Sequence, residues 1–194
     1  MGQAFFFVNP AKKQFLNPSC FAENNKAGTY LEGNHARAVA LLVVNPTQVS
    51  VDNEPDHNYG PMAGSWFGDP IYAAGDDCGP PNQFGIVTAT EADPNRNLFF
   101  LAEAEYEDIS YKAIAMMCMG RFWHETGTSD FAEELAERAR RCESLLMELG
   151  NVVFTVGCPP LEDALKAIIG DDWISRYEQA YKKCPWMGTP PRHR

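Results

Sequence analysis

Hydrophobic positions follow two different periods along the chain, and these periods separate predicted strands from predicted helices. Near the N-terminus, the apolar run 5–8 stops at the turn residues Asn9-Pro10, and a second apolar pair follows at Phe15-Leu16. This pattern predicts a β-hairpin over residues 4–16. Residues 98–106 alternate in part between apolar and polar side chains, which predicts another hairpin together with a strand from Phe84 to Thr90.

The clearest helical pattern covers residues 130–149. Its apolar residues recur at steps of three or four and form one stripe: Phe131, Leu135, Ala139, Cys142, Leu146 and Leu149. Gly150 is placed to end this helix, and the β-branched residues within 151–156 predict a strand after it. Similar spacing and capping signals predict helices at 35–44, 108–123, 161–169 and 171–183.

Together these elements predict a single α+β domain over residues 1–194, with an antiparallel or mixed sheet and a mainly helical C-terminal part. The sheet is predicted from residues 4–16, 66–75, 84–106 and 151–156. Residues 1–111 are expected to be mostly sheet plus one buried helix, residues 112–184 mostly helical, and residues 185–194 an extended tail.

The stretch from Gly64 to Gly79 reads GSWFGDPIYAAGDDCG and is predicted to lie at the centre of the fold. Two Gly-Asp steps bracket the short apolar run 70–74, which suits a buried strand between two tight turns. We expect Trp66 to be buried against the sheet or the 130–149 helix. We expect Gly68 and Gly75 to adopt backbone conformations that other residues resist.

The charge and the cysteine content restrict which classes of partner and which cellular compartment we expect. The 194 residues include 16 Lys and Arg against 26 Asp and Glu, a net charge of −10, which disfavours nucleic acid as a partner. No apolar run approaches the ~20 residues that span a bilayer, so no membrane association is expected. The start of the chain has no basic segment before its apolar run, and the six cysteines form no C-x-x-C pair. We therefore expect reduced thiols and a cytoplasmic protein.

Acidic turn residues are the main candidates for chemistry. If the two Gly-Asp turns fold to the same edge, Asp69, Asp76 and Asp77 could converge and bind a divalent cation such as Mg²⁺ or Ca²⁺. Ordinary turn capping by these aspartates is the alternative. His57, in an acidic loop, is the best candidate for a general base. The aspartates beside Cys78 disfavour its thiolate, and no cofactor-binding fingerprint occurs.

The opening M-G-Q-x-F-x-x-V-N and the block G-S-W-F-G-D-P-I-Y-A-A-G-D-D resemble a family of small uncharacterised intracellular proteins. That family has an M-G-Q start and a G-S-W-x-G-D-x-I-x-x-x-G-D block. The resemblance covers about residues 1–111, and Pro70 departs from the family pattern. It implies a shared fold and no particular reaction.

Two functions remain open from the sequence. The first is a non-catalytic, soluble binding or self-associating protein, a homo-oligomer or a partner of another protein, because residues common at interfaces recur in the chain. These residues are Met116, Met117, Met119, Trp123, Trp173 and Trp186. The alternative is a small metal-assisted hydrolase that uses the aspartate cluster with His57.

Overall fold

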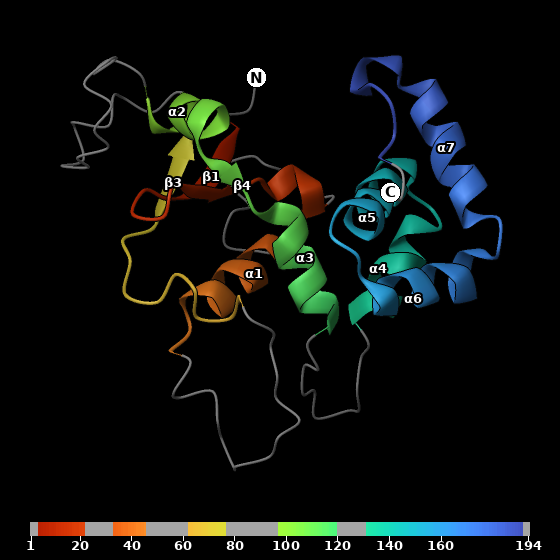
Figure 1. Cartoon of the computed structure of the whole chain (residues 1–194), viewed down its shortest axis with the longest axis horizontal. Helices are drawn as coiled ribbons and strands as arrows, with labels where there is room; N and C mark the ends of the chain where they lie inside the picture. Colours follow the sequence, from red (N-terminus) through yellow and green to blue (C-terminus); the bar gives the residue numbers. More distant parts are fainter. Residues whose placement is uncertain (1–3, 22–32, 46–61, 77–96, 120–130, 192–194) are drawn as a thin grey trace, which may run out of the picture. The chain divides into compact units, whose positions relative to one another are not determined.

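The computed structural model describes residues 4–21, 33–45, 62–76, 97–119 and 131–191 of the chain (Figure 1). Helices and a mixed sheet form an α+β fold whose C-terminal part is helical, which confirms the predicted fold class. Contacts divide the chain into two compact units. Unit 1 comprises residues 1–46 and 64–110, and unit 2 comprises residues 47–63 and 111–194. Each unit is described by itself below.

Unit 1 is built on a four-stranded sheet with the order β3-β1-β2-β4. The predicted hairpin is confirmed, because β1 (Phe5–Asn9) pairs antiparallel with β2 (Gln14–Leu16). β1 also pairs antiparallel with β3 (Tyr72–Gly75), and β2 pairs in parallel with the short β4 (Glu107–Asp108). The central strand β1 is buried along its whole length, as expected for a strand with neighbours on both sides.

Three helical segments accompany the sheet: η1 (Pro18–Phe21), α1 (Asn34–Val43) and α2 (Leu98–Glu105). The prediction of a strand at 98–106 is therefore wrong. Asn97 caps α2 by accepting a hydrogen bond from the backbone N–H of Phe100 at 3.0 Å, and the Leu, Ala and Glu residues that follow favour helix. The predicted strand at 84–90 lies outside the described residues.

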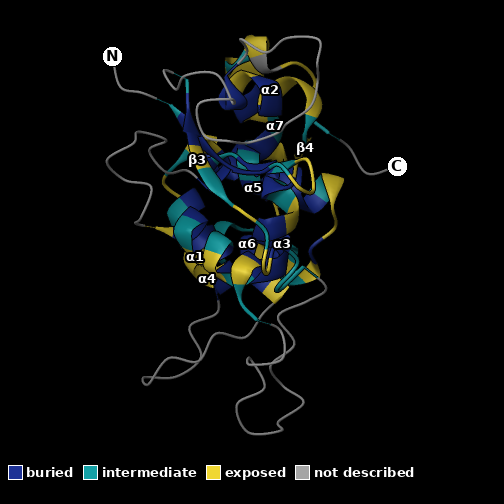
Figure 2. Ribbon diagram, turned by 90° about the vertical axis from the view of Figure 1, so that its left-hand side faces the viewer, coloured by how far each residue is buried: buried dark blue, intermediate teal, exposed yellow. Residues whose placement is uncertain are grey.

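The core of unit 1 lies between the sheet and α2. The ring of Phe6 from β1 stacks on the ring of Phe99 from α2, with centroids 4.1 Å apart. Figure 2 shows that α2 carries buried residues on one side and exposed residues on the other. Eight buried residues form this cluster: Phe6, Val8, Phe15, Ala74, Leu98, Phe99, Leu101 and Ala102.

Unit 2 is helical where it is described. After α3 (Ser110–Met119), which starts at the end of unit 1, come α4 (Phe131–Ala139), α5 (Glu143–Thr155), α6 (Pro159–Ile169), α7 (Trp173–Lys183) and the 3-10 turn η4 (Pro185–Met187). The predicted helices at 161–169 and 171–183 are confirmed with small shifts at their ends. The predicted extended tail begins instead with η4.

Two predictions in unit 2 are wrong. The helix expected at 130–149 breaks at residues 140–142, and the strand expected at 151–156 is the last part of α5. Gly150 lies inside α5 and does not end it. Val152 and Val153 are buried, so helix packing overrides the preference of β-branched residues for strands.

Gly150 allows α5 and α7 to approach closely. A Cβ atom at this position would lie 2.3 Å from Cδ2 of Tyr177, far inside van der Waals contact. The Tyr177 ring cannot swing away freely, because it is 1 % exposed and packs against the rings of Phe154 and Tyr181. The small residue therefore fits the spacing of these two helices.

We expect Gly150→Ala to lower the free energy of unfolding by about 1–3 kcal/mol through overpacking. This is the opposite of the gain of roughly 1 kcal/mol that alanine normally gives inside a helix. Urea unfolding followed by circular dichroism measures the change. In a Tyr177→Leu background the same substitution should cost much less, because the ring is gone. A Gly150→Ala variant as stable as the wild type would contradict the close approach.

Candidate functional site

The segment between Gly64 and Asp69 closes the C-terminal end of α1. The backbone N–H of Gly64 donates to the carbonyl of Leu41 at 2.9 Å, and the N–H of Trp66 donates to the carbonyl of Leu42 at 2.8 Å. The last carbonyls of a helix have no partner within the helix, and here a distant part of the chain supplies their donors. The strand predicted at 66–75 is thus shorter, because its first part forms turns and only Tyr72–Gly75 pairs with β1.

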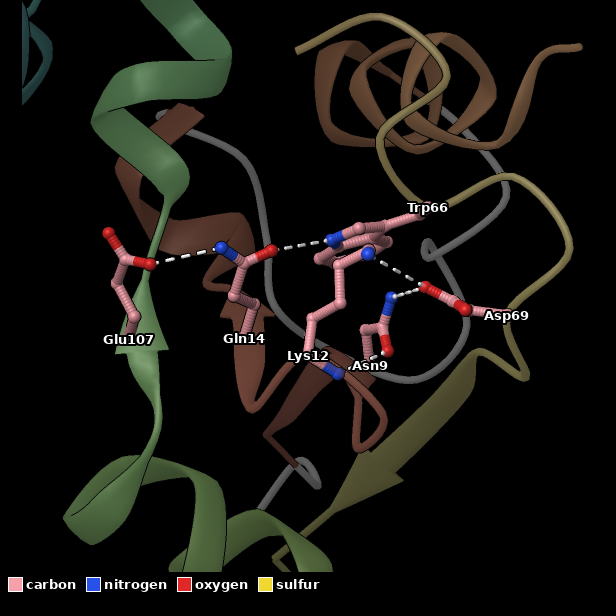
Figure 3. Close-up of polar contacts among 6 residues, drawn as sticks. All are labelled: Asn9, Lys12, Gln14, Trp66, Asp69 and Glu107. Carbon is pink, nitrogen blue, oxygen red and sulfur yellow. Dashed lines mark hydrogen bonds and ion pairs between the residues drawn. The ribbon is translucent and has the colours of Figure 1, made fainter.

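Trp66 is completely buried, which confirms its predicted burial, and its polar contact is with the sheet. Its indole Nε1–H donates to Oε1 of Gln14 on β2 at 2.9 Å. The amide Nε2 of Gln14 donates in turn to Oε2 of Glu107 on β4 at 3.0 Å (Figure 3). The tryptophan, the glutamine and the glutamate therefore form a continuous chain of hydrogen bonds from the Gly64–Asp69 segment across two strands.

Asp69 accepts contacts from the β1–β2 turn. Nδ2 of Asn9 donates to its Oδ2 at 2.9 Å, and Nζ of Lys12 lies 3.7 Å from the same oxygen (Figure 3). Asn9 is fully buried, and its own Oδ1 accepts from the backbone N–H of Lys12 at 3.1 Å. The Lys12 side chain is 44 % exposed, so this ion pair contributes little to stability. The carboxylate of Asp69 mainly joins the turn to the segment after Trp66.

The two described aspartates of the candidate metal cluster do not come together. Asp69 contacts Asn9 at one end of β1, whereas the backbone N–H of Asp76 donates to the carbonyl of Ala4 at the other end, at 3.0 Å. Ala4 and Asn9 are five residue steps apart along an extended strand, which is about 16 Å at the usual rise per residue. The described part of the chain holds no group of three or more His, Cys, Asp or Glu side chains suited to a metal ion. His57, Asp77 and Cys78 lie outside it.

Gly68 and Gly75 in the central stretch differ in backbone conformation. Gly68 has a φ of 81°, which glycine adopts readily and other residues resist, as predicted. Gly75 is not among the described glycines with positive φ, so the prediction for it is wrong. It lies in β3 opposite Phe5, and pairing with β1 continues to the N–H of Asp76, so the chain stays extended through Gly75.

A buried polar cluster in unit 2 was not found from the sequence. Oδ1 of Asn151 accepts hydrogen bonds from the hydroxyls of Tyr177 at 2.9 Å and Tyr181 at 2.8 Å. Nδ2 of Asn151 donates to the hydroxyl of Tyr111 at 3.1 Å, and that hydroxyl donates to Oε2 of Glu148 at 2.8 Å. Burial is the main cause that raises the pKa of Tyr177, so its hydroxyl stays protonated.

The hydrogen bonds of this cluster indicate a structural role. The amide oxygen of Asn151 accepts from two tyrosines and its amide nitrogen donates to a third, so the donors and acceptors satisfy one another. The sequence signal was the pair Tyr177 and Tyr181, four residues apart on a helix, with an asparagine inside an apolar helical stretch.

The predicted interface residues divide into buried and exposed groups. Met116, Met117 and Trp173 are at most 1 % exposed, so they belong to the core. Met119 is 46 % exposed and Trp186 is 79 % exposed. Trp123 lies outside the described residues.

Two further features concern the cysteines and the helices. No disulfide joins any two of the five cysteines that the structure describes. Within the described ranges, none of the helices combines the length and the apolar character that crossing a membrane requires.

Comparison with protein-family models, with curated proteins and with solved structures found no significant match. The family resemblance of the N-terminal and central stretches therefore stays a prediction. The arguments about function depend on the contacts, exposure and charges described above.

Proposed function

We propose that this is a non-catalytic, soluble protein of the cytoplasm that acts by binding another protein chain or a second copy of itself. The observation that carries the proposal is the exposure of Trp186, whose side chain is 79 % accessible at the end of unit 2. A tryptophan costs free energy when water surrounds it, and tryptophan is enriched at the centres of protein interfaces. The net charge of −10 makes a nucleic acid an unfavourable partner.

The alternative, a metal-assisted hydrolase, has less support. It needs Asp69, Asp76 and Asp77 at one place with His57, and the two described members lie at opposite ends of β1. Oδ2 of Asp69 already accepts from Asn9 and faces Nζ of Lys12, so a cation at this oxygen would compete with both contacts. The contacts of Asp69 with Asn9 and Lys12 join the β1–β2 turn to the segment after Trp66, a structural role that needs no reaction.

A thermal-shift experiment separates the two functions. We expect Mg²⁺, Ca²⁺, Mn²⁺ and Zn²⁺ to leave the melting temperature unchanged, because no described cluster binds them. A cation at one hundred times its Kd would add about 2.7 kcal/mol to the stability of a protein that binds it only when folded. Asp69→Asn is the matched control, since asparagine keeps the shape and removes the charge. A metal-induced stabilisation that Asp69→Asn abolishes would favour the hydrolase.

The exposed tryptophan gives a direct test of binding. Trp186→Ala should reduce the average molar mass that sedimentation velocity records at high protein concentration, whereas its stability should stay within about 0.5 kcal/mol of the wild type. Phe100→Ala is the control, because this side chain is also exposed, at 44 %, but lies in unit 1. Equal masses for the wild type and Trp186→Ala would show that Trp186 takes no part in self-association.

A further inference from the structure

The two ends of α7 carry opposite charges. Asp171 and Asp172 directly precede the helix, and both are exposed. At the other end, Lys182 and Lys183 occupy the last turn and are exposed as well. Residues 179–194 contain no acidic side chain, although the whole chain has a net charge of −10. The C-terminal end of α7 is therefore a basic region on an acidic protein.

The neighbouring helix adds two carboxylates, Glu162 and Asp163, and one ammonium group, Lys166, near the acidic end. Glu162 pairs with Lys166 at 2.9 Å on α6, and this carboxylate, followed by Asp163 and Asp171, raises the pKa of Lys166. The carboxylates of α6 and of the α6–α7 turn are thus close enough to act on the same ammonium group. At the basic end, Glu143 pairs with Lys183 at 2.6 Å, so Lys182 is the better candidate for a contact with another molecule.

An exposed apolar side chain accompanies each charged end. Trp186 follows the basic end in η4 and is 79 % exposed, and Ile174 lies in the first turn of α7 and is 39 % exposed. Figure 1 shows α7 within unit 2 with the α6–α7 turn at one end and η4 at the other. The eleven residues of α7 span about 16 Å at the helical rise per residue, so these are two separate surfaces.

We propose that copies of this protein associate head to tail through the two ends of α7. The basic end of one copy, with Trp186 and Lys182, docks on the acidic end of the next copy, with Asp171 and Ile174. This inference rests on the self-associating form of the proposed function. It names the occupant of the Trp186 surface as a second copy of the chain.

Charge complementarity favours contacts between unlike ends of α7 over contacts between like ends. A symmetric contact between two basic ends places lysine against lysine, and one between two acidic ends places aspartate against aspartate. Like charges facing each other across an interface disfavour binding, whereas opposite charges set the orientation. A chain with a net charge of −10 also repels its own copies, so contact is favoured where its basic region is. When one such contact joins two copies, the pair keeps one unused end of each kind, so the association continues beyond a dimer. A closed pair, in which both ends of one α7 meet the opposite ends of its partner's α7, would instead stop at a dimer.

Two variants test the proposal by blocking one end each. Lys182→Glu with Trp186→Ala blocks the basic end, and Asp171→Lys with Ile174→Ala blocks the acidic end. All four side chains are exposed, so both proteins should fold, which circular dichroism checks. We expect the wild type to exceed the mass of a dimer as concentration rises, and each variant alone to remain monomeric in sedimentation velocity.

The mixture of the two variants is the decisive sample. Each partner retains the end that the other lacks, so an equimolar mixture should form a one-to-one dimer and nothing larger. Raising the salt from about 0.1 M to about 1 M shortens the Debye length from about 10 Å to about 3 Å and should weaken this dimer several-fold. Phe100→Ala should associate like the wild type.

Three results would overturn the head-to-tail contact: a mixture that stays monomeric, a wild type that stops at a dimer, or a wild type that is monomeric at every concentration. None of them alone removes the proposed binding function, because a different protein chain could still dock on Trp186. Failure of that function shows separately, as stabilisation by a metal ion that depends on Asp69.

Discussion

Trp66→Ala should lower the free energy of unfolding by roughly 3–5 kcal/mol, the range for truncating a large buried aromatic side chain. The indole is 0 % exposed, and its loss leaves a cavity beside the sheet of unit 1. The substitution also removes the donor to Gln14, which itself bonds to Glu107 on β4. Chemical denaturation followed by circular dichroism measures the change.

A matched pair of variants separates packing from hydrogen bonding at this site. Trp66→Phe keeps much of the ring volume and loses the Nε1–H, and Gln14→Ala removes the acceptor and keeps the indole. Because Gln14 is partly exposed, water can replace the lost partner, so we expect the Gln14→Ala change to cost only about 1 kcal/mol. If Trp66→Ala costs less than about 1 kcal/mol, the residue is peripheral and the central role predicted for the Gly64–Gly79 stretch is wrong.

The sequence predicted elements well where local signals agree with burial. The hairpin at 4–16 has a buried apolar run, a turn with Asn9 and a return strand, and all three agree with one structure. The helices at 161–169 and 171–183 have clear ends at Pro160, Gly170 and Cys184. Where the hydrophobic pattern and the turn or capping residues agree in this way, they predict an element without information about distant residues.

The errors come from residues whose conformation depends on distant contacts. Residues 98–105 fit a strand by alternation, and the cap at Asn97 and the packing of Phe99 on Phe6 make them a helix. Val152 and Val153 favour strands in isolation, and their burial in unit 2 keeps them in α5. Neither contact can be read from the local pattern of apolar positions.

Prediction of the candidate site from the sequence is limited in the same way, because part of it depends on contacts between distant residues. Burial of Trp66 follows from its size and apolar character, and the positive φ of Gly68 follows from turn chemistry. Whether Asp69 and Asp76 converge depends on the register of β3 against β1, which places them at opposite ends. The opposite charges of the two ends of α7 were visible in the sequence, but their exposure together with Trp186 and Ile174 required the structure.

The second large effect is expected at Asn151, in the polar cluster of unit 2. Asn151→Ala removes the acceptor of two tyrosine hydroxyls and the donor to a third. A buried polar group without a partner costs about 1–3 kcal/mol. Among the described residues, the hydroxyl of Tyr181 donates only to Asn151, whereas the hydroxyl of Tyr177 lies 3.5 Å from the carbonyl of Pro191 and can turn toward it. We therefore expect a total loss of roughly 2–4 kcal/mol in the free energy of unfolding.

A double-mutant cycle with Tyr181→Phe identifies the cause of that loss. In the wild-type background, removing the Tyr181 hydroxyl should cost about 1 kcal/mol, because one hydrogen bond to Asn151 is lost. In the Asn151→Ala background the same substitution should be neutral or stabilising, because it removes a buried hydroxyl that has lost its acceptor. The two effects should thus differ by about 1 kcal/mol or more, within the range of coupling energies between residues in contact. Additive effects would show that Asn151 stabilises unit 2 through packing alone, and the cluster would then not act as one network.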